Sequence, residues 1–149
     1  MPQSQLYERD FYAWANEQAA LLRAGELSLA DIEHIALEIE SMGKTEKREL
    51  VSRLTVLMLH LLKWRFQPAG RGNSWRLSIA NSRDEIVDHL DDNPSLKSLL
   101  KDAMASAWRY ARRKASVETN LSEETFPSEC PWVFEQMMEA EFWPEEECG

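Results

Sequence analysis

Glycine and β-branched residues are scarce in this sequence, and their scarcity favours helices over sheets. Only five of the 149 residues are glycine, and long stretches lack valine, isoleucine and threonine. Such stretches are rich in residues that lose little freedom in a helix. The hydrophobic fraction of 44% suits one core of ordinary size and leaves little room for a second. We therefore expect an all-α protein, a single-domain helical bundle over residues 1–149.

Long apolar runs are also missing. No run approaches the roughly 20 residues that a membrane span requires, and Met1–Gln5 is not a basic start followed by an apolar stretch. We therefore expect a cytoplasmic protein without membrane contact. Cys130 and Cys148 lack the spacing of metal ligands, and a reducing compartment would keep both as free thiols.

The motifs of common catalytic and nucleotide-binding sites are absent. The sequence contains no H-E-x-x-H, nucleophile elbow, phosphate-binding P-loop or dinucleotide fingerprint, and Gly70-Arg71-Gly72 has too little context to count as one. Neither cysteine has a predictable base beside it. We therefore expect no cofactor, no metal and no catalytic residues.

Charge is present in abundance, but it is segregated along the chain. Residues 1–43 carry a net charge of −6 and residues 44–76 a net charge of +6, while residues 115–149 hold ten acidic and no basic side chains. One interpretation is that the acidic segments fold beside the basic helix. The other is that a basic face remains open to acidic or phosphate-rich partners.

Apolar periodicity predicts three helices in the first half of the chain. The first covers about Tyr7–Ala24, with Gly25 as its stop, and the second runs from a cap at Ser28 to Gly43. The third, Lys44–Phe66, ends because Pro68 follows, and it would be roughly 35 Å long. Its second half is apolar nearly all round, which predicts a central position.

Two more main helices and a short one are predicted after a loop at residues 67–74. The fourth helix carries a stripe from Trp75 to Leu90, and the fifth begins near Asn93 or Ser95 and carries apolar residues as far as Ala111. A short helix is expected at about residues 131–140. The acidic, aromatic-rich tail over residues 119–149 should pack across the bundle, or across a second copy.

Two histidines are candidate ligands or catalytic groups. His60 lies in the apolar part of the third helix, at the edge of its stripe, which fits a hydrogen-bonded structural ring or a ring facing a cleft beside Trp64. His34, with Asp31 and Glu38, has the i, i+3, i+4 spacing of helical metal sites. These three side chains are predicted to project away from the apolar face, so we expect a solvated polar face there.

Basic and aromatic residues gather around the loop, where they form a candidate binding set. Interleaved aromatic planes and cations are what single-stranded nucleic acid or phosphate ligands require. The alternative is that the rings fill the core while the cations are solvated, and the net charge of −9 opposes general phosphate binding. The candidate set, with His60 and Arg48 included, is Arg48, His60, Lys63, Trp64, Arg71, Trp75 and Arg76.

Several stretches of the sequence together resemble a known family. The stretches are Tyr7–Trp14, Glu38–Gly43 with Lys47–Leu50, His60–Trp64, Ser74–Arg76, Asn93–Leu96 and Phe126–Pro131. Over roughly residues 5–145 the chain resembles the bacterial domain of unknown function family twenty-nine, DUF29. The resemblance implies an α-helical bacterial protein of about this length, and it brings no established reaction or ligand.

Our preferred hypothesis is a non-catalytic helical interaction module that acts as a homo-oligomer or binds another bacterial protein through the basic helix and the aromatic tail. The first alternative is a nucleic-acid-associated accessory protein that uses the basic and aromatic set. The second is a small metal-assisted or hydrolase-like enzyme centred on His60 with Glu38, Glu40 or Glu49.

Overall fold

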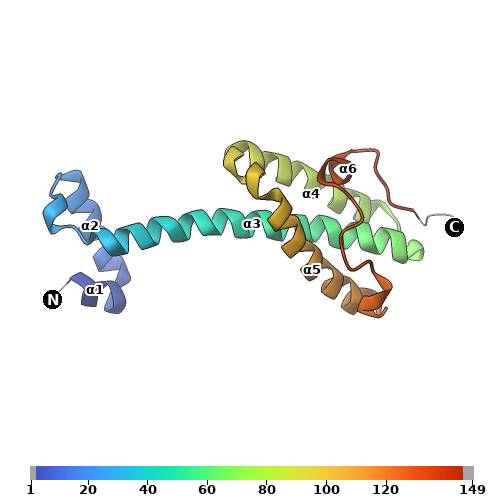
Figure 1. Ribbon diagram of the computed structural model, residues 1–149, viewed down its shortest axis with the longest axis horizontal. Helices are drawn as coiled ribbons and strands as arrows, with labels where there is room; N and C mark the ends of the chain where they lie inside the picture. Colours follow the sequence, from blue (N-terminus) through green and yellow to red (C-terminus); the bar gives the residue numbers. More distant parts are fainter. Residues whose placement is uncertain (1–2, 146–149) are drawn as a thin grey trace. The chain divides into compact units, whose positions relative to one another are not determined.

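All regular structure in the described part of the chain is helical, as the sequence predicts (Figure 1). The computed structural model describes residues 3–145. Its α-helices are α1 (Gln3–Arg9), α2 (Phe11–Arg23), α3 (Ile32–Phe66), α4 (Asn73–Asp92), α5 (Leu100–Thr119) and α6 (Phe134–Met138). Short 3-10 turns lie between them at Leu27–Leu29, Pro68–Gly70, Pro94–Leu99 and Glu123–Thr125. Among these residues, no helix is both long and apolar enough to cross a membrane.

The chain divides into two compact units, and α3 passes from one into the other. The N-terminal unit extends to Thr45, and the C-terminal unit begins at Glu46. The N-terminal unit holds α1, α2 and the first half of α3. The C-terminal unit holds the second half of α3 and everything after it.

The predicted first helix is in fact two helices, because Asp10 separates them. The Asp10 carboxylate accepts a hydrogen bond from the backbone N–H of Ala13 at 3.1 Å, which makes Asp10 the N-cap of α2. The predicted stop at Gly25 is confirmed. Its φ of +73° is readily adopted only by glycine, and its N–H donates to the carbonyl of Leu22.

The predicted stop at Gly43 is wrong, because α3 continues through it. An interior glycine costs a helix only about 1 kcal/mol relative to alanine. The helix from Ile32 to Phe66 has long stretches of good helix formers on both sides of Gly43, so one unfavourable residue does not end it. The predicted end at Phe66 is correct.

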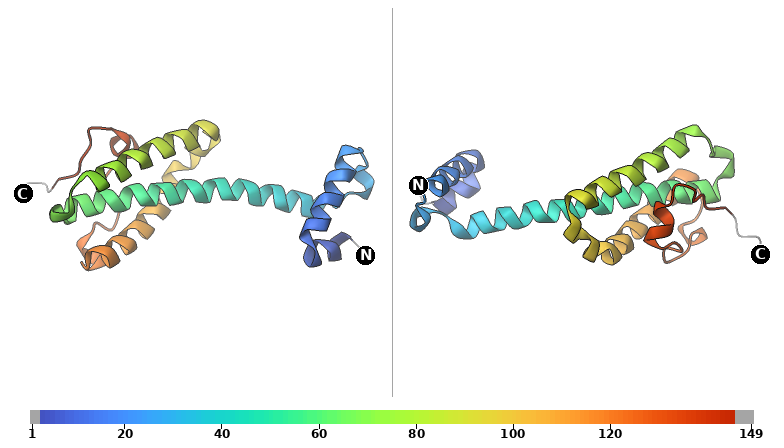
Figure 2. Two further views of the ribbon diagram at one scale, coloured as in Figure 1. Left: turned by 180° about the vertical axis from the view of Figure 1, so that it is seen from behind. Right: turned by 90° about the horizontal axis from the view of Figure 1, so that it is seen from above.

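The core of the C-terminal unit surrounds the second half of α3. Both further views show α4 and α5 lying along this part of α3, with the segment around α6 crossing the same unit (Figure 2). The described part of the tail contributes side chains to this core. Fully or nearly fully buried members include Leu50, Leu54, Leu57, Leu61, Ile79, Ile86, Ala107, Trp108, Phe126, Trp132 and Met137.

Arg83 of α4 fastens the tail to this core. It is only 6% exposed, and its guanidinium donates hydrogen bonds to the backbone carbonyls of Met137, Ala140 and Phe142. Its charge also lies over the ring of Trp143, 5.5 Å from the centroid. Burial lowers the pKa of Arg83 from its ordinary value. The sequence analysis did not single out this residue.

Candidate functional site

The structure brings together five members of the predicted basic and aromatic set at the end of α3. The guanidinium groups of Arg71 and Arg76 lie 5.4 and 5.3 Å from the centre of the Trp64 ring. Arg71 also donates from Nε to the carbonyl of Trp64 at 2.6 Å. The ring of Trp143, from the tail, packs against Trp64 with centroids 4.7 Å apart. The faces of Trp64 are thus contacted by groups of the same chain.

The ring of Trp75 is also contacted by groups of the same chain. The ammonium of Lys63 lies 4.9 Å from the centre of the Trp75 ring, and it also pairs with Glu118 of α5 at 3.5 Å. The ring lies against the backbone at Gly70, where an added Cβ would stand 2.6 Å from Cζ2 of Trp75. Only glycine leaves room for this contact. The cluster therefore combines internal cation–π contacts with close packing.

Among the described residues, His60 and Arg48, the other two predicted residues, form no hydrogen bond, ion pair or ring contact with this cluster. Nδ1 of His60 lies 2.8 Å from the carbonyl oxygen of Val56 in the same helix. This is a satisfied, half-buried ring. Arg48 is exposed on α3 and makes no ion pair with any described residue.

The basic segment at residues 44–76 is only partly neutralised by acidic side chains. Arg53 pairs with Glu49 and Glu85, and Lys63 pairs with Glu118. The other basic side chains of this segment form no ion pair within the described part of the chain. They are Lys44, Lys47, Arg48, Arg65, Arg71 and Arg76.

In the N-terminal unit, Asp31, His34 and Glu38 pack against α1 and α2, although the sequence predicts a solvated polar face there. Asp31 accepts hydrogen bonds from the indole of Trp14 at 3.1 Å and from His34 at 2.8 Å. The ring of Tyr7 stacks on His34 with centroids 4.1 Å apart, and the Tyr7 hydroxyl donates to Glu38. The predicted orientation of this helix is therefore wrong: its polar side, not its apolar stripe, faces α1 and α2.

This cluster shifts two pKa values. The hydrogen bond to the Glu38 carboxylate raises the pKa of Tyr7, because it favours the neutral phenol. For Asp31, burial raises the pKa, but the hydrogen bonds from His34 and Trp14 lower it by more, so its net pKa lies below the ordinary value.

The opposite side of α3 in this unit is exposed and apolar. Ile32, Ile39 and Met42 expose 60%, 62% and 68% of their surface. Their spacing of seven and three residues places them on one side of the helix. We call these three residues the α3 stripe. The sequence analysis placed an apolar face on this helix, but periodicity does not say what covers such a face.

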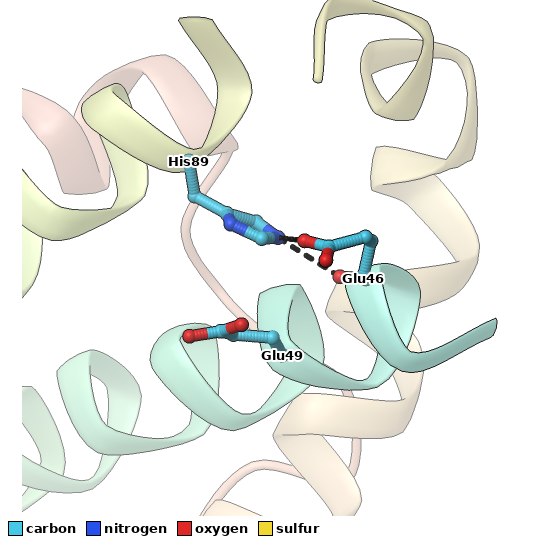
Figure 3. Close-up of side chains that lie close together, drawn as sticks. All are labelled: Glu46, Glu49 and His89. Atoms are coloured by element: carbon cyan, nitrogen blue, oxygen red, sulfur yellow. Dashed lines mark hydrogen bonds and ion pairs between the residues drawn. The ribbon is translucent and has the colours of Figure 1, made fainter. Parts of the chain in front are cut away.

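A second cluster of titratable groups lies in the C-terminal unit, between α3 and α4 (Figure 3). Glu46 and Glu49 project from one side of α3, and His89 reaches them from the last turn of α4. One potential ligand atom from each residue lies within 4.8 Å of the other two. His89 is 7% exposed, and its Nε2–H donates to the backbone carbonyl of Glu46 at 2.9 Å.

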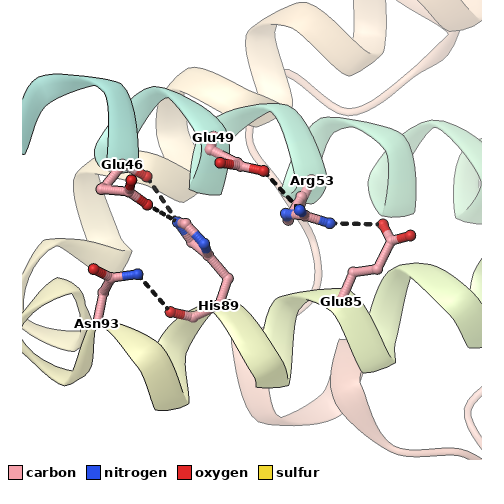
Figure 4. A network of polar contacts seen from close by, with 6 residues as sticks. All are labelled: Glu46, Glu49, Arg53, Glu85, His89 and Asn93. Carbon is pink, nitrogen blue, oxygen red and sulfur yellow. Dashed lines mark hydrogen bonds and ion pairs between the residues drawn. The ribbon is translucent and has the colours of Figure 1, made fainter. Parts of the chain in front are cut away.

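Salt bridges and a cap extend this cluster along the helix pair (Figure 4). Arg53 lies 2.6 Å from Glu49 and 2.9 Å from Glu85, so it links α3 to α4. Asn93 donates to the carbonyl of His89 at 3.1 Å. The sequence analysis missed the Glu46–Glu49–His89 cluster because His89 lies about forty positions after the two carboxylates in the sequence. The only local signal was the pair of glutamates three residues apart.

The comparisons with known proteins identify the family of the chain. The family model for the domain of unknown function DUF29 matches residues 6–143, nearly the whole chain, and the protein therefore belongs to this family. No curated protein and no solved structure matches the chain.

Proposed function

We propose that this protein is a non-catalytic helical interaction module that pairs with a second copy of itself through the α3 stripe. The observation that carries the proposal is the concentration of exposed apolar side chains in the N-terminal unit. Among the described residues, nine of the fifteen large hydrophobic side chains that are exposed belong to residues 11–42. Apolar surface gathered in this way is typical of protein–protein contacts.

The N-terminal unit has little core of its own. Only Trp14 and Gln18 are buried among its described side chains, and most of its packing comes from the polar and aromatic cluster around Asp31. So small a core contributes little hydrophobic stabilisation. Covering Ile32 and Ile39 would add about 1.5–3 kcal/mol for each fully buried side chain. Association through this face therefore supplies what the unit lacks.

The charges that flank the stripe support a second copy as the occupant. Glu33 and Glu40 are exposed within the span of the stripe, and Lys44, Lys47 and Arg48 are exposed just after it. Two α3 helices that cross antiparallel near Glu40 would bring the Ile39 and Met42 side chains of the two copies together. The same register would place Glu33 of each copy beside Lys47 of the other. Complementary charges of this kind set the orientation of paired helices.

The test is the oligomeric state of the full chain. Sedimentation equilibrium or light scattering at about 100 μM should detect a dimer with a dissociation constant in the micromolar range. The double substitution Ile32→Ser with Ile39→Ser should make the protein monomeric. It should not reduce the helix content, because both side chains are exposed. The matched control is Val117→Ser, which removes an exposed β-branched side chain from α5.

A second experiment tests the charges beside the stripe. Lys44→Glu with Lys47→Glu should weaken the dimer, and adding Glu33→Lys and Glu40→Lys should restore it. A wild-type protein that is monomeric at every concentration would overturn the proposal. So would a dimer that survives the two stripe substitutions, because the contact would then lie elsewhere.

A further inference from the structure

We propose that Glu46, Glu49 and His89 form a binding site for a divalent transition-metal ion of the Zn²⁺ type. The three side chains offer two carboxylates and one imidazole, with one potential ligand atom from each lying within 4.8 Å of the other two (Figure 3). Zinc takes histidine nitrogen and carboxylate oxygen at about 2.0–2.2 Å. This site lies within the C-terminal unit and does not depend on the proposed dimer.

The helix pair fixes where these ligands stand. Residues three apart are neighbours on a helix surface, so Glu46 and Glu49 point to the same side of α3. His89 comes from the neighbouring helix and is nine-tenths buried, which restricts its ring to one place. The carboxylates expose 43% and 42% of their side chains, so they can move the short distance needed to close on an ion.

The hydrogen bonding of His89 suits a metal ligand. A ring that binds a metal through one nitrogen usually donates the other N–H to a carbonyl, a carboxylate or water. Here the backbone carbonyl of Glu46 and its carboxylate lie 2.9 and 3.7 Å from Nε2. The carbonyl accepts the Nε2 proton, which leaves Nδ1, a nitrogen without a hydrogen bond to any described residue, as the atom that would bind the ion.

The local charge also favours a cation. Two carboxylates face the imidazole ring of His89, and a divalent ion would balance their charge. Arg53 contacts one oxygen of Glu49 at 2.6 Å but divides its charge with Glu85 at 2.9 Å (Figure 4). Arg53 thus orients the Glu49 carboxylate and leaves the other oxygen for a ligand bond.

The imidazole decides the class of metal. Ca²⁺ and Mg²⁺ prefer oxygen ligands alone, whereas Zn²⁺, Co²⁺ and related ions accept histidine with carboxylates. Three protein ligands leave at least one position for water or for a donor from a bound molecule. An ion in this place would join α3 to α4 and add to the stability of the C-terminal unit.

The experiment uses the full chain without an affinity tag, freed of metal by a chelator. Titration with Zn²⁺ should give one site per chain by calorimetry, and Co²⁺ should give the visible absorption of a nitrogen- and oxygen-ligated ion. His89→Gln should weaken Zn²⁺ binding by at least about tenfold. Glutamine can still donate to the Glu46 carbonyl, so the helix contact is retained. His60→Gln is the matched control and should bind as the wild type does.

A second variant keeps the test independent of folding. Glu46→Gln changes a half-exposed side chain, should leave the circular dichroism unchanged, and should weaken binding in the same way. The absence of saturable binding would overturn the proposal, as would binding that His89→Gln and Glu46→Gln leave unchanged. A strong near-ultraviolet thiolate band with Co²⁺ would also overturn it, because the ion would then be on a cysteine.

Discussion

The guanidinium of Arg83 donates from Nε to the carbonyl of Met137 at 2.7 Å, across fifty-four residues of sequence. This bond and its two companions hold the C-terminal segment against α4. A buried charge must be compensated by hydrogen bonds, and backbone carbonyls supply the compensation here. Arg83 therefore holds residues 137–142 against the fourth helix.

Replacing Arg83→Met should destabilise the C-terminal unit by about 2–4 kcal/mol, because three tail carbonyls lose their donor in a buried place. Urea denaturation followed by tryptophan fluorescence measures this loss. Arg109→Met is the control, since Arg109 is exposed and contacts only Tyr110. Equal stability of the two variants would contradict the role of Arg83.

Replacing Gly70→Ala should cost about 1–3 kcal/mol, because the new Cβ would overlap the Trp75 ring and force it to move. The near-ultraviolet circular dichroism of the tryptophans should change with it. Gly72→Ala is the control: its Cβ would meet nothing within 4 Å, and its φ of −175° suits any residue. A Gly70→Ala protein as stable as the control would show that Trp75 does not pack there.

Replacing Gly43→Ala should stabilise the protein by about 0.5–1 kcal/mol, since alanine is the better helix former and its Cβ meets no atom within 4 Å. Thermal unfolding followed by circular dichroism at 222 nm is the measurement. A decrease in stability would indicate that α3 is interrupted at Gly43, as the sequence analysis predicted.

Acid should weaken the N-terminal unit only below about pH 4. The folded pKa of Asp31 is depressed, so its contribution is complete above the unfolded pKa and is lost as pH falls through the folded value. The indole N–H resonance of Trp14, which donates to Asp31, should report this titration by NMR. In Asp31→Asn the acid-induced shift should vanish. A midpoint above pH 4 in the wild type would contradict the depressed pKa.

The sequence by itself determined the all-α class, the end of α3 at Phe66 and the apolar character of its second half. These follow from local rules: Pro68 cannot continue a helix, and a segment that is apolar nearly all round must be covered. Local rules competed at Asp10 and Gly43. Asp10 and Gly43 are both residue types that can end or start a helix. Whether such a residue interrupts a helix depends on its neighbours, which is why Asp10 does so and Gly43 does not.

Only the tertiary structure decided which helix faces meet. It turned the polar side of α3 toward Tyr7 and Trp14 and left the stripe at Ile32 and Ile39 exposed. It also placed His89 beside Glu46, a contact that depends on the position of α4 along the axis of α3. Periodicity states that a face exists, whereas the register between helices determines what that face touches.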